Sequence, residues 1–195
     1  MKEPKYLVQL LERTEHFCKL FKLVTLAKLP EWIEEAQAVA DICSKRHPTH
    51  SYVMYISNNP VDLAKGEAKL IQQEAIKKLK GEQSKIGITT STKAMYLGMS
   101  RVINSFDFDD KDNPTKTRTR VLTALEDSGI SGAYTRTPNG VHLHVASRDA
   151  NKVIDLLAHK VPDIYLNKLD KTGHDLCSPI EGTYKDGYLI TKGKL

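Results

Sequence analysis

The chain has 195 residues, 29 of them Lys or Arg against 24 Asp or Glu, which gives a formal net charge of +5 and a pI near 9.0. Hydrophobic residues make up 40% and charged residues 27%, which excludes a generally disordered chain. No apolar run approaches the ~18 residues of a membrane span, so no membrane partner is expected, and the basic excess favours a polyanionic partner such as nucleic acid or a nucleoside triphosphate.

Neither the first residues nor the cysteines indicate export or a metal ribbon. The start, MKEPKYLVQLLERTEHF, carries charges within its apolar pattern and no small-residue cleavage site, so a cytoplasmic location is expected. Cys18, Cys43 and Cys177 are widely spaced and form no CxxC pair, which argues against a zinc ribbon or a disulfide framework.

The predicted elements begin with helices. Residues 5–27 carry apolar side chains at spacings of three and four, which predicts an amphipathic helix. Pro30 fits the first turn of a second helix that runs to about Ser44. We therefore expect an N-terminal helical segment over 1–46 and a separate domain over 47–195.

From residue 52 onward, strands and helices alternate. The predicted strands cover 52–57, 101–109, 133–137, 140–147, 163–169 and 187–191, and the predicted helices cover about 61–80, 115–128 and 149–160, with a loop-rich stretch over 81–100. The strands on either side of Pro138-Asn139-Gly140 form a hairpin. This pattern predicts an α+β fold, in which helices pack on a mixed or antiparallel sheet.

Asp107 and Asp109 are the sharpest local feature, within the sequence INSFDFDD. Side chains two apart in a strand project from the same face, so Phe106 and Phe108 would enter a core on the other face. Two adjacent carboxylates repel unless a cation lies between them, and Mg²⁺ or Mn²⁺ prefers such oxygen ligands. The same residues also fit an acidic strand end that enters a turn. An EF-hand is excluded, because Asp112 stands where that loop needs glycine.

The hairpin sequence T-P-N-G-V-H-L-H-V is the second feature. His142 and His144 share one strand face, and an imidazole beside the tight turn at Gly140 can donate to a phosphate oxygen. Arg136 on the preceding strand could bind the same phosphates with a bidentate guanidinium. A histidine on a strand is also commonly structural. A helix between the two features would return the hairpin to the sheet near Asp107.

In this order, the motifs resemble those of archaeo-eukaryotic primases and primase-polymerases. These enzymes have an hhhDhD motif and a later Gly-x-His strand, and YVMYISNNPVDLAKGEAKLI (52–71) is similar to their opening Tyr-x-x-Asn-Pro strand and helix. SPIEGTYKDGYL (178–189) resembles the Pro-Gly-Thr stretch of small phage-type members. The resemblance covers about residues 52–190. It implies an RRM-like catalytic core, and a host cytoplasmic location if a phage encodes the chain.

The resemblance also implies the roles of individual residues. Asp107 and Asp109 would bind the metal, His142 would contact the nucleotide phosphates, and a later strand would supply a third acidic ligand. We assign that ligand to Asp170, with Asp163 and Asp175 as alternatives.

The mechanism that we expect is two-metal nucleotidyl transfer on a single-stranded DNA template. A 3′-hydroxyl would attack the α-phosphate of a nucleoside triphosphate and expel pyrophosphate. His142, Arg136, Gly140 and Lys185 would bind the triphosphate. Because the chain encodes neither a zinc cluster nor a helicase, a separate helicase or replication protein would be its partner.

Two alternatives remain open. His142-Leu143-His144 and Tyr165-x-x-Lys168 also match HUH-type rolling-circle replication endonucleases, in which two imidazoles hold a metal and a tyrosine attacks the scissile phosphate. The basic balance equally allows a non-catalytic nucleic-acid-binding domain or primase accessory subunit.

Overall fold

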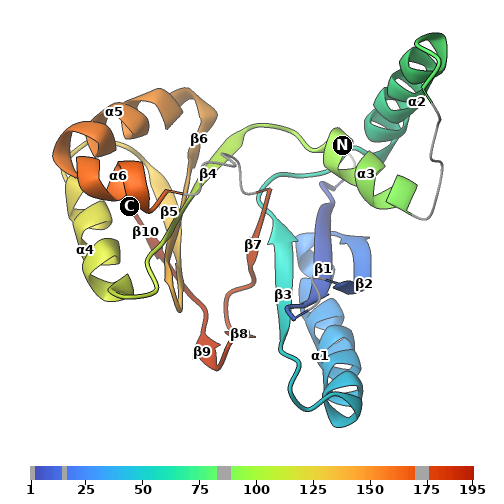
Figure 1. Cartoon of the computed structure of the whole chain (residues 1–195), viewed down its shortest axis with the longest axis horizontal. Helices are drawn as coiled ribbons and strands as arrows, with labels where there is room; N and C mark the ends of the chain where they lie inside the picture. The colour runs from blue at the N-terminus through green and yellow to red at the C-terminus, as the bar shows by residue number, and fades with distance from the viewer. Residues whose placement is uncertain (1–2, 15–16, 83–88, 170–175) are drawn as a thin grey trace.

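The computed structural model describes residues 3–14, 17–82, 89–169 and 176–195, except the side chains of residues 89–92 (Figure 1). Within these residues the strands form two four-stranded sheets and a two-stranded hairpin, and helices pack on the sheets. The α+β class predicted from the sequence is confirmed. No helix of the described residues is long and apolar enough to span a membrane.

The first sheet has the strand order β2-β1-β3-β7, and its neighbouring strands are antiparallel. These strands are β1 (Tyr6–Glu12), β2 (Phe17–Val24), β3 (Tyr52–Ser57) and β7 (Cys177–Pro179). One face packs against α1 (Leu29–Arg46) through Trp32 and Ala36, which meet Val8 and Leu10 of β1. This core joins the expected N-terminal segment to β3.

The opposite face of the first sheet packs against the segment of α3 (Thr89–Gly98), through Met95 and Met99, and α3 in turn packs against α2 (Leu63–Leu79). The two helices approach closely at Gly66 and Gly98, where an added Cβ would overlap the backbone of the neighbouring segment. In Figure 1, α2 extends away from both sheets.

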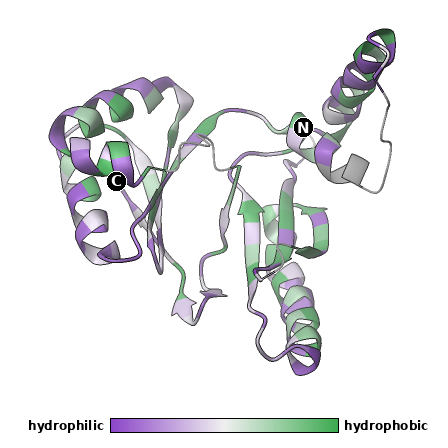
Figure 2. Cartoon of the chain, in the orientation of Figure 1, coloured by the Kyte–Doolittle hydropathy of each residue, from purple (hydrophilic) through white to green (hydrophobic). Residues whose placement is uncertain are grey.

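The second sheet has the strand order β10-β5-β6-β4, again with antiparallel neighbours. Its strands are β4 (Ile103–Asp109), β5 (Gly132–Thr137), β6 (Gly140–Ala146) and β10 (Thr191–Lys194). The helices α4 (Pro114–Leu125), α5 (Ala150–Lys160) and α6 (Pro162–Asn167) cover one face, over a core of Phe106, Phe108, Val141, Leu143 and Val145. The helices are striped with hydrophilic and hydrophobic residues (Figure 2), as expected of amphipathic helices on a sheet.

Shorter elements connect these units. They are the 3₁₀ helices η1 (Leu26–Lys28) and η2 (Ser147–Asp149), and the hairpin of β8 (Tyr184–Lys185) and β9 (Tyr188–Leu189). The β8–β9 segment follows β7 and leads into β10, so residues 177–194 run from the first sheet to the second (Figure 1).

Three sequence predictions are wrong. Residues 5–27 form β1 and β2 rather than a helix, because β1 is buried on both faces and its nearly continuous apolar run lacks a period of two. The segment expected to be extended over 163–169 is mostly helix α6, which begins at Pro162. The loop-rich stretch over 81–100 contains α3. The helix predicted from Pro30 is confirmed as part of α1.

Candidate functional site

The helix-free face of the second sheet carries the predicted acidic pair. Phe106 and Phe108 are buried against the helices, so the residues that alternate with them, Ser105, Asp107 and Asp109, project from the other face. Asp109 is exposed at the end of β4, and Asp107 is half-buried. The predicted division of this strand into an aromatic face and an acidic face is confirmed.

His142 lies directly opposite Asp107 in the β4–β6 ladder. Its Nε2 atom is 3.3 Å from Oδ1 of Asp107, and its side chain is 3% exposed. The helix between the two motifs does return the hairpin to the acidic strand, as the sequence spacing predicted. A half-buried acid on the edge strand β4 and a buried imidazole on its neighbour β6 therefore lie side by side.

His144, the second histidine of the hairpin, is held by two hydroxyl groups. Ser105 Oγ lies 2.9 Å from Nδ1 and Thr135 Oγ1 lies 2.9 Å from Nε2, so a hydroxyl occupies each ring nitrogen. Metal binding by this imidazole would require one of these contacts to break. His144 therefore forms part of the wall of the site, beside His142, with ring centroids 6.5 Å apart.

Gly140 has a packing role that the sequence alone did not reveal. It pairs with Asp109, and a Cβ at this position would overlap the carbonyl oxygen of Phe108. Only glycine lets β6 approach β4 this closely. Arg118 of α4 fixes the same turn, because it donates to the carbonyl oxygens of Thr137 (3.0 Å) and Gly140 (3.2 Å).

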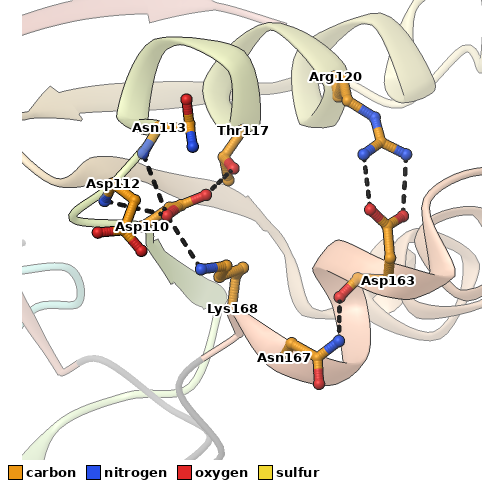
Figure 3. Close-up of polar contacts among 8 residues, drawn as sticks. All are labelled: Asp110, Asp112, Asn113, Thr117, Arg120, Asp163, Asn167 and Lys168. Atoms are coloured by element: carbon orange, nitrogen blue, oxygen red, sulfur yellow. Dashed lines mark hydrogen bonds and ion pairs between the residues drawn. The ribbon is translucent and has the colours of Figure 1, made fainter.

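Asp110, which sequence reasoning did not single out, organises the end of β4 (Figure 3). Its carboxylate is buried and accepts hydrogen bonds from Thr117 Oγ1 at 2.7 Å, from Lys168 Nζ at 3.0 Å and from the backbone N–H groups of Asp112 and Asn113. The hydrogen bonds from Thr117 and Lys168 lower the pKa of Asp110 from 3.8 to about 2, against the effect of burial. Asp110 therefore has a structural role, with hydrogen bonds to both of its carboxylate oxygens. The turn-forming sequence DKDNP is the one sequence feature that could have indicated this role.

Of the three candidates for the third acidic ligand, only Asp163 lies within the described residues. Asp163 lies on α6 and forms two hydrogen bonds with Arg120, at 2.6 and 2.9 Å, which lower its pKa (Figure 3). It belongs to the helix layer, not to the face of Asp107. Asp170 and Asp175 lie outside the described residues. Leu169, which precedes Asp170 in the sequence, bridges to Phe108 of β4.

Arg136 does not reach the acidic face. It lies opposite Val141 in the β5–β6 ladder, and Val141 belongs to the core beneath the helices. Its guanidinium lies 5.5 Å from the centre of the Tyr134 ring and donates to the Tyr134 hydroxyl at 3.2 Å. The expected contact of Arg136 with a triphosphate bound at His142 is inconsistent with this placement, since adjacent residues in a strand point to opposite faces.

The residues of the nicking-endonuclease alternative are also separated. Tyr165 packs against the core beneath the helices, whereas His142 and His144 project from the opposite face of the sheet. The ammonium of Lys168 binds Asp110. The structure therefore does not bring the tyrosine to the histidine pair.

Lys185 is a buried cation near the end of the acidic face. Its side chain is 5% exposed, and we find no hydrogen bond or ion pair for it among the described residues. It lies opposite Tyr188, whose ring lies 6.0 Å from the guanidinium carbon of Arg118, the residue that fixes the Gly140 turn. A lysine at this position can supply positive charge to an anionic ligand that approaches the Gly140 turn.

Two asparagines of the SNNP sequence fix the end of β3, Asn59 to the second sheet and Asn58 to β7 of its own sheet. Asn59 is 4% exposed, and its Oδ1 accepts from the backbone N–H groups of Val102 and Ile103, while its Nδ2 donates to the Ile103 carbonyl at 2.8 Å. Asn58 Oδ1 accepts from Ser178 of β7 at 2.7 Å. The end of β3 is thereby fixed to the start of the acidic strand.

Comparisons of the chain with protein-family models, with curated proteins and with solved structures found no match. The candidate site is therefore defined by its geometry alone. Within the described ranges, no three His, Cys, Asp or Glu side chains are grouped so that they could hold a metal ion. The ligands available there are the carboxylates of Asp107 and Asp109.

Proposed function

We propose that the chain is a template-directed nucleotidyltransferase of the DNA primase or primase-polymerase type. One observation carries the proposal: Asp107 and Asp109 leave one face of β4, and the imidazole of His142 lies 3.3 Å from the first of them. Two carboxylates that could bind a metal ion thus accompany an imidazole that could donate a hydrogen bond to a phosphate oxygen. Nucleotidyl transfer uses both kinds of group.

Each residue of the site has a distinct task in this proposal. Asp107 and Asp109 would hold Mg²⁺ or Mn²⁺, with Asp170 as the proposed third ligand; when bound, the ions supply positive charge that screens the triphosphate and acidifies the attacking hydroxyl. His142 would donate to a phosphate oxygen. Lys185, whose hairpin partner Tyr188 lies beside Arg118 of the Gly140 turn, would neutralise phosphate charge there.

The rest of the network holds these groups in place. Gly140 allows the histidine strand to approach the acidic strand, and Ser105 and Thr135 orient the neighbouring His144. The reaction would form an ester bond between a 3′-oxygen and the α-phosphate and would release pyrophosphate. Template, nucleoside triphosphates and a separate helicase or replication protein would be the partners.

The test is nucleotide incorporation. The purified chain is incubated with Mn²⁺ or Mg²⁺, a single-stranded DNA template and labelled nucleotides, with and without a primer. Extension products or newly made dinucleotides that disappear with EDTA are expected. Asp107→Asn and Asp109→Asn should abolish incorporation. Asp163→Asn is the matched control, because it removes a carboxylate of the helix layer, and it should incorporate nucleotides like wild type.

Two other outcomes would contradict the proposal. A covalent protein–DNA adduct lost in Tyr165→Phe would indicate a nicking endonuclease. Salt-sensitive binding to single-stranded DNA, with no product under any metal condition, would indicate a binding or accessory domain.

A further inference from the structure

Lys192 lies in the same cross-strand row as the acid and the imidazole of the site. Asp107 of β4 pairs with His142 of β6, His142 pairs with Thr135 of β5, and Thr135 pairs with Lys192 of β10. Residues directly opposite one another in an antiparallel ladder project from the same face of the sheet. The register therefore extends the row from the acidic strand to a basic residue at the sheet edge.

Two independent contacts fix the orientation of this row. The hydroxyl of Thr135 contacts the imidazole of His144, so Thr135 points to the helix-free face. On the other face, an added Cβ at Gly193 would overlap the Tyr134 ring, which packs against the core beneath the helices. Because Gly193 belongs to the helix side, the preceding residue Lys192 belongs to the side of Asp107.

The exposed Lys192 also borders a cleft between the two sheets. This cleft has a volume of about 520 Å³ and is lined by Lys192 and His144 from the second sheet and by Ser57 and Asn58 from the first. The cleft reaches the site face at His144. The cleft lies beside the row and meets it at Lys192, so an anion that reaches Lys192 would have space next to this cation.

We propose that Lys192 binds the terminal phosphates of a nucleoside triphosphate whose α-phosphate lies at Asp107 and His142. This inference rests on the proposed function. Three strand spacings of ~4.8 Å separate the backbones of β4 and β10 by roughly 14 Å, and the flexible lysine side chain shortens that gap. Lys192 thus takes the role expected of Arg136, which points to the other face.

Equilibrium binding of labelled nucleotides to the full chain tests this assignment. Wild type and Lys192→Ala are titrated with a deoxynucleoside triphosphate, with the matching monophosphate and with a single-stranded oligonucleotide, each with Mn²⁺ and again with EDTA. We expect Lys192→Ala to weaken triphosphate binding about tenfold or more and to leave monophosphate binding unchanged, because the monophosphate lacks the terminal phosphates. Lys192→Arg should restore most of the affinity.

Two charge-matched controls define the face. Arg136→Ala removes a cation from the same sheet but from the helix side, and Lys116→Ala removes an exposed cation of α4. Both should bind the triphosphate like wild type. The inference is wrong if Arg136→Ala weakens triphosphate binding and Lys192→Ala does not, if only oligonucleotide binding depends on Lys192, or if wild type binds no triphosphate.

The incorporation assay separates this inference from the proposed function. If wild type and Lys192→Ala incorporate nucleotides with equal KM, the inference fails while the proposed function stands. If wild type incorporates none but binds triphosphate in a Lys192-dependent way, the proposed function fails while the Lys192 site stands.

Discussion

Lys168 joins the end of α6 to the end of the acidic strand through two separate groups. Its ammonium lies 3.0 Å from Oδ1 of Asp110, and its carbonyl oxygen accepts a 3.0 Å hydrogen bond from the backbone N–H of Asp109. The end of β4 is therefore fixed at two neighbouring residues, at Asp109 through its backbone and at Asp110 through its side chain. The consequence is that the position of Asp109 depends on a contact made far away in the sequence.

Loss of this contact should destabilise the protein. In Lys168→Met the buried Asp110 carboxylate keeps its hydrogen bonds from Thr117 and the backbone but loses its cation, so we expect a loss of about 1–3 kcal/mol in the free energy of unfolding. Urea denaturation measures this loss. Asn167→Ala, which alters the same helix end without touching Asp110, is the comparison; an equal loss in both variants would contradict the role of the ion pair.

The same carboxylate predicts a dependence of stability on pH. The pKa of Asp110 is lowered to about 2 in the folded state from an ordinary 3.8, so the unfolded chain binds more protons between these values. The stabilisation is present above pH 3.8 and is lost as the pH falls toward 2. The free energies of unfolding of wild type and Asp110→Asn, measured by denaturation at each pH, should converge over this range. If the difference in unfolding free energy between the two proteins does not change with pH, the network does not act through the charge of Asp110.

The carboxylates of the site should behave in the opposite way from Asp110. Replacing Asp107 or Asp109 with Asn should abolish nucleotide incorporation but leave the melting temperature unchanged or raised, because two like charges on one strand face repel. Incorporation and thermal melting are measured on the same preparations. Full activity in either variant would reject its assignment as a metal ligand.

The two histidines of the hairpin should separate function from stability. His142→Gln should lower incorporation with little loss of stability. His144→Phe should cost about 1–3 kcal/mol, because it leaves the buried hydroxyls of Ser105 and Thr135 without their imidazole partner. Chemical denaturation and incorporation assays on both variants check the separation. The reverse pattern would identify His144 as the functional residue.

Much of the site could be predicted because it depends on local periodicity. Alternation alone placed Asp107 and Asp109 on one face and Phe106 on the other, and the helix length between the motifs brought His142 back to the acidic strand. For Arg136 the sequence analysis considered only the strand and not the face, and the pairing of Arg136 with Val141 puts it on the helix side.

The remaining features depend on pairings that no local pattern encodes. Lys168 meets Asp110 across 58 positions of sequence, and Lys192 joins the row of His142 only because β10 pairs with β5. The strands β1 and β2 were missed for a different reason: with both faces of β1 buried, its apolar run fits a helix as well as a strand.

Asn59 offers a final test, because it fixes the two sheets to each other. Its amide accepts from Val102 and Ile103 and donates to Ile103, so its side-chain hydrogen bonds within the described residues all go to the start of β4. Asn59→Ala should leave these buried backbone groups without partners and cost about 2–3 kcal/mol in the free energy of unfolding. Asn59→Asp keeps the acceptor but loses the donor and should cost less. If hydrogen exchange at the backbone amides of Val102 and Ile103 is no faster in Asn59→Ala than in wild type, Asn59 does not hold the start of the acidic strand.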